Sequence, residues 1–295
     1  MSNRVALFLL LAGTFAIGFS PTLVRLSEIG PVATAVYRVA LALPVLFAVL
    51  AIEPRAAAAT PSRAVPVGWR EWRDVGLTGL FFTGDLVFWH WSITETTVAN
   101  ATLFATSTPI FVTLAAWLWL GERITGRFLA GLALSLAGAA LLAGSSYQSA
   151  PGHLTGDFYG VVTALFFSGY LIMVKRLRAT LSAAAIMAWS GIVTAAGLAV
   201  LNIFVGDAWI PLSLAGWAIL ITLAVVSHAA GQGLVAHTLA RLPASFTAVA
   251  MLAEPLFAAA IAWLVLNEAV TPLQAAGGLV ILVGIVTARP RETAP

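Results

Sequence analysis

Long apolar stretches alternate with short polar breaks along the whole chain. Ten of these stretches approach the ~20 residues that an α-helix needs to cross a bilayer. Charges and prolines separate the stretches, so we expect ten membrane-spanning helices and no separate soluble domain. The break from Glu53 to Arg73 is predicted to be a linker. The ten ranges are 5–24, 32–52, 74–94, 98–120, 126–144, 157–174, 182–204, 214–237, 244–266 and 272–288.

The composition agrees with this pattern. Hydrophobic residues make up 60% of the 295 residues and charged residues 9%, against ~45–50% and ~25% in soluble domains. Such a chain cannot cover a water-exposed surface, which excludes a soluble globular enzyme, a disordered chain and a nucleic-acid binder. Cysteine is absent, so disulfides, thiolate metal sites and a cysteine nucleophile are excluded. The sequence predicts an all-α membrane protein.

The cations predict an orientation. If the N-terminus is cytoplasmic, 13 of the 15 Lys and Arg residues fall on the inner side; Arg25 lies outside and Arg38 lies within the second range. Inner loops of membrane proteins carry this excess, so both termini are predicted to be cytoplasmic. The first range follows Arg4 as in a signal peptide, but it is too long for one and lacks a clear cleavage site. We therefore expect it to be retained.

The chain contains an internal repeat with an offset of 146 residues. Residues 108–138 align without gaps to 254–284, and Ala116-Trp117-Leu118 meets Ala262-Trp263-Leu264. The copies lie five ranges apart, and an odd number of crossings gives them opposite orientations. We therefore predict two five-helix halves, 1–146 and 147–295, related as an inverted repeat. Many secondary transporters are built in this way.

Several short motifs accompany the repeat: Tyr37-Arg38, Pro109, Leu120-Gly121-Glu122-Arg123, Glu254-Pro255, Asn267-Glu268 and Gly277 with Gly284. With these motifs the chain resembles the drug/metabolite transporter superfamily, and its EamA-type branch in particular. Asn267 stands where glycine is more usual. The resemblance implies ten helices as 5+5, a multi-pass protein of the bacterial inner membrane, and transport in place of catalysis. Within the superfamily the chain looks most like bacterial amino-acid and metabolite exporters, including the aromatic amino acid exporter group.

Ionisable residues near the middle of the predicted helices are the candidates for a site. Each costs ~2.5–3.5 kcal/mol at membrane depth, so it normally faces a partner or a wet cavity. Asp85, His228 and Glu254 are such residues; Gln232 lies one turn from His228, and Trp89 one turn from Asp85. The repeat does not copy them. We predict that they line one central cavity, and polar contacts between helices are the alternative.

If the solute is a zwitterion, each of these residues can be assigned a binding role. Asp85 or Glu254 would bind an ammonium group, and the donors for a carboxylate would be His228, Gln232 and Arg38. Aromatic rings suited to an apolar side chain are Trp89, Tyr37 and Tyr170. Alternatively, Arg38 reaches the outer surface and pairs with Glu28 or Glu95.

Prolines and small residues carry two further predictions. Pro109 and Pro255 are repeat equivalents inside predicted helices, where each removes a backbone donor. They are either static kinks or a symmetric pair of hinges. Small residues in the fifth and tenth ranges favour close helix packing, or else the seam of a homodimer. These residues are Gly131, Ser135, Gly138, Gly277 and Gly284.

The function predicted from the sequence is secondary transport of small metabolites, with amino acids as solutes and export as the direction. There is no nucleotide-binding Gly-rich loop ending in Lys-Ser/Thr, and the four histidines lack metal-ligand spacing. We therefore expect no cofactor, no metal and no ATP-driven step. The alternatives are multidrug efflux on the same scaffold and a membrane-embedded enzyme or scaffold protein.

Overall fold

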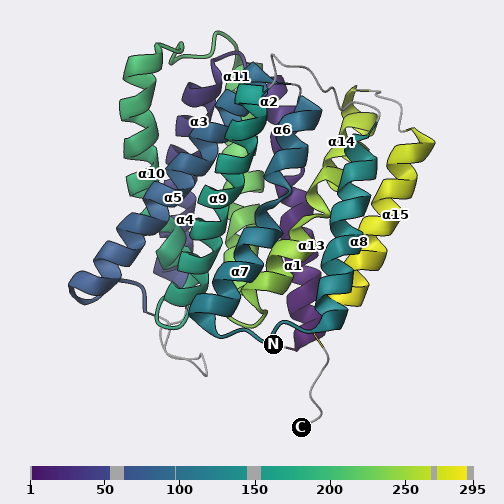
Figure 1. Cartoon of the computed structure of the whole chain (residues 1–295). Coiled ribbons are helices and arrows are strands. Elements are labelled where there is room, and N and C mark those ends of the chain that lie inside the picture. The colour runs from purple at the N-terminus through teal and green to yellow at the C-terminus, as the bar shows by residue number, and fades with distance from the viewer. Residues whose placement is uncertain (1, 54–62, 97, 145–153, 267–270, 291–295) are drawn as a thin grey trace.

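The computed structural model describes residues 2–53, 63–96, 98–144, 154–266 and 271–290. Within these residues the chain is helical and forms no named β-strand (Figure 1). The motif Asn267-Glu268 lies outside the described residues, as do Arg55 and Arg291, two of the cations counted for the orientation. The helices are α1 (Asn3–Ile17), α2 (Ser20–Arg25), α3 (Pro31–Ala40), α4 (Ala42–Ile52), α5 (Gly68–Glu95), α6 (Val98–Ala105), α7 (Thr108–Leu120), α8 (Gly126–Ala143), α9 (Leu154–Leu177), α10 (Ala183–Val205), α11 (Leu214–Thr222), the π-helix η2 (Leu223–Gln232), α12 (Gly233–Thr238), α13 (Ala244–Met251), α14 (Glu254–Leu266) and α15 (Pro272–Ala288).

Helices occupy all ten predicted ranges. One boundary is wrong: α5 begins at Gly68, so the stretch from Gly68 to Arg73 is helix and not linker. By length and composition, eight helical segments of the described chain can cross a membrane; α5 is not among them, and α15 is a shorter apolar helix. The chain is therefore a multi-pass membrane protein with eight candidate spans.

The second half repeats the helix boundaries of the first half at the same offset of 146 residues. The helices α6, α7 and α8 begin at Val98, Thr108 and Gly126, while α13, α14 and α15 begin at Ala244, Glu254 and Pro272. In Figure 1, α6 lies above α7, whereas α13 lies below α14. Equivalent helices thus run in opposite directions, which fits an inverted repeat.

Two membrane-crossing segments are broken at equivalent places. The segment α6–α7 breaks after Ala105, and α13–α14 breaks after Met251. Pro109 and Pro255 lie at the second position of the helices that follow, where the missing N–H costs nothing because it would be unpaired in any helix. The prolines therefore start new helices and interrupt the longer ones.

Helices α8 and α15 pack closely along their small residues. A Cβ atom added to Gly131 would lie 2.4 Å from the Ala288 nitrogen, and one added to Gly138 would lie 2.6 Å from the Ile281 nitrogen. Ser135 also donates a hydrogen bond to the Ile281 carbonyl, at 3.5 Å. The small-residue faces thus meet each other within one chain.

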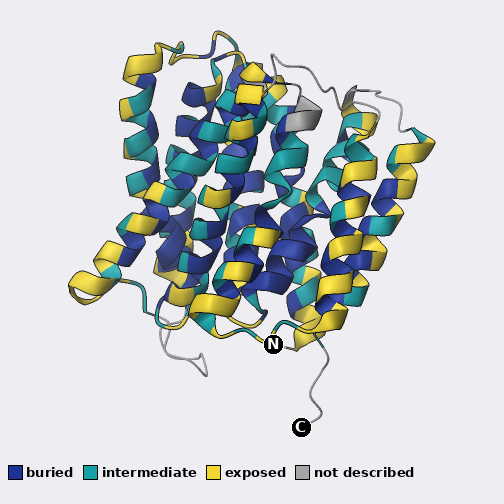
Figure 2. Ribbon diagram, in the orientation of Figure 1, coloured by how far each residue is buried: buried dark blue, intermediate teal, exposed yellow. Residues whose placement is uncertain are grey.

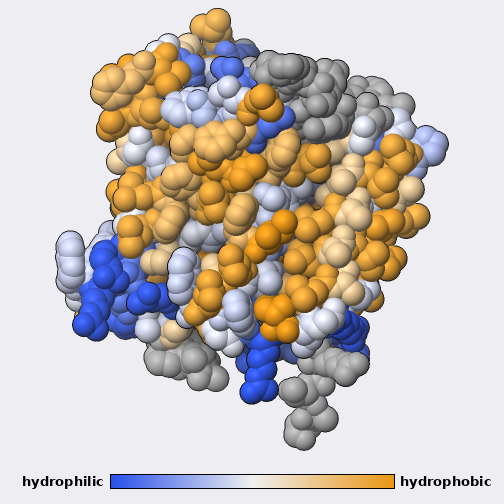
Figure 3. Space-filling view, viewed as in Figure 1, coloured by the Kyte–Doolittle hydropathy of each residue, from blue (hydrophilic) through white to orange (hydrophobic). Residues whose placement is uncertain are grey.

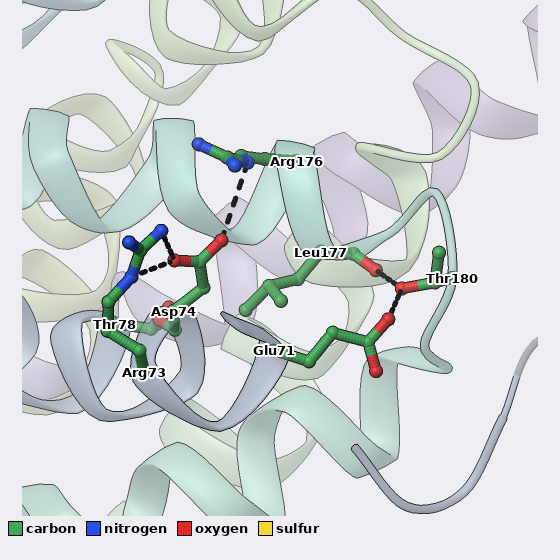
Figure 4. A network of polar contacts seen from close by, with 7 residues as sticks. All are labelled: Glu71, Arg73, Asp74, Thr78, Arg176, Leu177 and Thr180. Atoms are coloured by element: carbon green, nitrogen blue, oxygen red, sulfur yellow. Dashed lines mark hydrogen bonds and ion pairs between the residues drawn. The ribbon is translucent and has the colours of Figure 1, made fainter. Parts of the chain in front are cut away.

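One end of the bundle carries α1's start and α15's end, and we call it the terminal end (Figure 1). Polar contacts join α5 to α9 and to the turn that follows α9 there (Figure 4). Asp74 pairs with Arg176 at 3.4 Å, and Thr180 donates to Glu71 at 2.9 Å. Figure 3 shows hydrophilic groups gathered at this end and an apolar surface above them, as expected for a bundle that crosses a membrane.

The opposite end, called the far end, also joins the two halves. Glu28 accepts hydrogen bonds from the amides of Leu212 and Ser213 and from the Ser213 hydroxyl. The Ser213 hydroxyl is the main cause that lowers the pKa of Glu28 from its usual value. Asp207 accepts from the Val32 amide at 2.8 Å, at the start of α3. Helices α3 and α11 are thus each held by a carboxylate of the other half.

Candidate functional site

A cavity of about 730 Å³ lies between the two halves, and we call it the central cavity. This volume falls within the ~300–1,000 Å³ of small-molecule sites. Its wall is built from α1, α2, α3, α5, α6, α7 and α8 on one side, and from α9, η2, α13, α14 and α15 on the other. It extends to Arg25, Ala143 and Gln274, which lie at the far end of the bundle.

The terminal end below the cavity is closed. Every residue of α13 is buried (Figure 2), and α13 packs against α7. Glu122, just after α7, accepts hydrogen bonds from the Ala244 amide at 2.6 Å and from the Ser245 amide at 3.1 Å. Lys175 of α9 donates to the carbonyls of Leu239 and Leu242, both at 2.8 Å. These bonds hold the α12–α13 connection in place, so the structure is a state whose cavity is shut toward the terminal end.

Three charged side chains meet at the inner part of the cavity. Arg38 of α3, Asp85 of α5 and Glu254 of α14 line it, and the charges of both acids act on Arg38. Arg38 is 6% exposed, and its Nε has no hydrogen-bond partner among the described residues. Asp85 and Glu254 are half-buried. The inner cavity therefore combines one cation with two carboxylates from both halves of the chain.

Neutral polar atoms around these charges are also unpaired. Ser20 Oγ, Thr163 Oγ1 and Gln232 Oε1 are buried, line the cavity and have no partner within the described chain. An unsatisfied buried polar group costs about 1–3 kcal/mol, which water or a solute in the cavity would relieve. The sequence analysis missed Ser20 and Thr163. A usable signal is that Ser20 precedes Pro21 at a helix break.

Most of the predicted site residues line this cavity. Those that do are Arg38, Asp85, Trp89, Gln232 and Glu254, together with both candidate hinges, Pro109 and Pro255. The geometry brings them together; their role in binding stays a prediction. The proposed pairing of Arg38 with Glu28 or Glu95 is wrong, because Arg38 faces the cavity and Glu28 is bonded to the start of α11.

Three predicted residues lie outside the cavity wall. Tyr37 packs edge-on against Trp217 with ring centroids 5.5 Å apart. Tyr170 is buried, donates to the Met187 sulfur at 3.1 Å, and contacts Phe82. His228 is 2% exposed, and its ring lies 5.4 Å from that of Phe82. Neither ring nitrogen of His228 has a partner within the described chain.

The aromatic residues around Asp85 divide between the cavity and the packing. Trp89 lines the cavity, while Phe88 stacks on Phe166 at 5.4 Å and Phe81 meets the same ring at 6.2 Å. His90 is buried beside Trp89, with its ring close to the Leu86 carbonyl. Only one face of α5 thus belongs to the site, and the other faces pack against α9 and α10.

The comparison with protein families agrees with this architecture. The model of the EamA-like transporter family matches residues 4–144 and again residues 154–288, one match in each half. The chain belongs to the EamA-like transporter family. The resemblance predicted from the motifs is thereby confirmed, and the two matches agree with two repeated halves in one chain.

Two further comparisons place this EamA-like transporter among known proteins. It is 27% identical to the pseudopaline exporter CntI of Pseudomonas aeruginosa, in strains UCBPP-PA14 and PAO1, over 202 residues, or 68% of this chain and 69% of the exporter. A solved crystal structure superposes with a TM-score of 0.82 at 19% identity, covering 97% of this chain and 98% of the other. That likeness supports the fold.

Proposed function

We propose that this EamA-like protein exports amino acids or related small metabolites across the bacterial inner membrane by alternating access. The observation that carries the proposal is the central cavity, where Arg38, Asp85 and Glu254 converge between the halves. The relative named as an exporter supports a metabolite as cargo. We further propose ten spans, with both termini in the cytoplasm, so that the terminal end faces inward.

The transport cycle follows from the broken helices. In the observed state α13 and α7 touch near the terminal end, while α6 and α14 contribute to the cavity wall nearer the far end. We propose that the halves 1–146 and 147–295 rock about the breaks before Pro109 and Pro255. That motion would close the far end and open the terminal end, as inverted repeats permit.

The cavity can recognise a zwitterion through opposite charges. Asp85 or Glu254 would accept hydrogen bonds from the solute's ammonium group, and Arg38 with the Gln232 amide would hold its carboxylate. Trp89 offers a ring for an apolar side chain. His228, Tyr37 and Tyr170 lie behind this wall. In the observed state they would therefore not contact the solute directly and would only position the residues that do.

Uptake by proteoliposomes containing the full chain tests the proposal. We expect saturable uptake of at least one amino acid from a labelled panel. The Glu254→Gln variant should slow that uptake. The control variant Glu95→Gln, which changes an exposed carboxylate outside the cavity, should not slow it. Absence of saturable uptake across the panel would contradict the proposal.

Multidrug efflux is the second candidate function. Two carboxylates beside Trp89 and Phe167 in one cavity would also suit aromatic cations. Saturable uptake of cationic drugs that lack a carboxylate, with no uptake of amino acids, would favour efflux. A homodimer is compatible with either function. It would use the outward faces of α8 and α15, which carry exposed apolar residues such as Leu279 and Val283.

A further inference from the structure

The acids of the central cavity differ from most acids elsewhere in the chain. Asp85 and Glu254 accept no hydrogen bond from any described residue, although both line the cavity. In contrast, Glu122 accepts three hydrogen bonds from Ala244 and Ser245, and Asp207 accepts from Val32 and Ala33. The two cavity acids thus present unused acceptor oxygens to whatever enters.

The charges of the inner cavity do not balance. Asp85 and Glu254 share Arg38 as the cation that acts on both of them. Arg25 also lines the cavity but is exposed at its mouth, where water and salt screen its charge. One carboxylate more than Arg38 can pair therefore remains, and at this depth it is either protonated or paired with a cation that enters the cavity.

We infer that the central cavity selects solutes with two cationic groups and one carboxylate, the pattern of a basic amino acid such as lysine or ornithine. This inference rests on the proposed transport function and narrows its substrate class. One ammonium group pairs with Asp85 and the other with Glu254, while the solute carboxylate meets Arg38. Two acids and one arginine in the protein then match two ammonium groups and one carboxylate in the solute.

The size of the cavity agrees with such a solute. A volume of about 730 Å³ has room for such a solute, and the acids come from different helices, α5 and α14. A solute with ammonium groups at both ends of a flexible chain can reach both carboxylates. The unpaired Gln232 and Thr163 atoms add neutral contacts along its length.

A pair of competitors that differ in one charge tests the inference in proteoliposomes containing the full chain. Uptake of labelled L-lysine is measured against unlabelled lysine and against Nε-acetyl-lysine, which keeps the length and the α-amino acid group but loses the second cation. We expect lysine to compete about tenfold better or more, because hydrogen bonds to charged groups are strong. Equal competition would overturn the inference, as would better uptake of labelled leucine or glutamate than of lysine.

Variants identify the acid that binds the second ammonium group. Asp85→Asn and Glu254→Gln each remove one carboxylate charge, and one of them should bring the competition ratio of lysine to acetyl-lysine close to one. Glu95→Gln is the matched control at an exposed carboxylate outside the cavity and should keep the wild-type ratio. Unchanged ratios in both cavity variants would overturn the inference.

The design separates this inference from the proposed function. Saturable uptake of amino acids without a preference for the second cation would support the proposed transport function and contradict the inferred substrate class. The absence of saturable uptake for every amino acid would contradict both. Should a cavity variant fail to fold, the competition ratio of the wild-type chain still decides the question.

Discussion

Buried polar atoms without partners gather around the central cavity. Of the ten such side-chain atoms in the described chain, four line it, on Ser20, Arg38, Thr163 and Gln232. Sequence reasoning found Arg38 and Gln232 because long polar side chains stand out in apolar helices. It missed Ser20 and Thr163, because a helical hydroxyl is usually satisfied by the carbonyl four residues earlier, as Thr14 is by Leu10. Hydropathy cannot separate the two cases.

His228 yields a prediction at this scale. His228→Phe keeps a ring against Phe82 and removes two unpaired buried nitrogens, so the melting temperature in detergent should rise. The expected gain is about 1–3 kcal/mol. Thr194→Val is the control: Thr194 donates to the Gly79 carbonyl at 2.9 Å, so this variant should melt earlier. A fall for both variants would show that His228 has a partner in the folded protein.

At the scale of elements, the internal repeat predicted features of the helices, such as their breaks, that the hydropathy pattern did not. The offset of 146 residues placed Pro109 and Pro255 at equivalent positions, and the structure breaks both helices just before them. The π-helix over Leu223–Gln232 was not predicted. Its equivalent in the first half, residues 77–86, is regular α-helix within α5, so the repeat does not extend to the helix type here.

The breaks yield the second prediction. Pro109→Ala and Pro255→Ala each restore a backbone N–H and remove the ring clash that disfavours a continuous helix. We expect uptake in proteoliposomes to slow several-fold, with the melting temperature unchanged or higher, because a straighter helix resists rocking. Pro31→Ala is the control, since Pro31 starts the ordinary helix α3. Wild-type rates in both cavity-side variants would show that these prolines are static kinks.

The closed terminal end yields the third prediction. Glu122→Gln keeps the shape of the side chain but loses the charge that holds the Ala244 and Ser245 amides at the start of α13. The population open at that end should increase. A single cysteine at Ala116, which is 0% exposed on α7, should then react faster with a maleimide than in the same chain with Glu122 intact.

The neighbouring residue supplies the control for this prediction. Arg123 is exposed and contributes no bond to the α13 start, so Arg123→Gln should leave the labelling rate of Cys at position 116 unchanged. Equal labelling in the Glu122→Gln and Arg123→Gln chains would show that Glu122 does not hold the terminal end closed.

For the whole molecule, the sequence predicted an all-helical bundle and its repeat, but not the state it adopts. The alternating-access states of a transporter share one sequence and differ by small free energies, so hydropathy and charge are silent on which end is shut. The contacts that decide it join distant segments: Glu122 with Ser245, and Lys175 with Leu242. No periodic pattern marks such pairs in advance.

Orientation in the membrane is the last prediction, and the cysteine-free chain allows a direct measurement. Leu212 is 97% exposed at the far end, whereas Arg123 follows α7 at the terminal end, where most of the cations gather. Positive-inside bias predicts a cytoplasmic terminal end. A membrane-impermeant maleimide added to intact cells, with the outer membrane permeabilised, should therefore label Leu212→Cys and spare Arg123→Cys. Inside-out vesicles should give the reverse. Labelling of both positions from one side would contradict the proposed ten spans, which place the two loops on opposite sides of the membrane. The reverse pattern would contradict the proposed orientation, because the observed cavity would then face the cytoplasm.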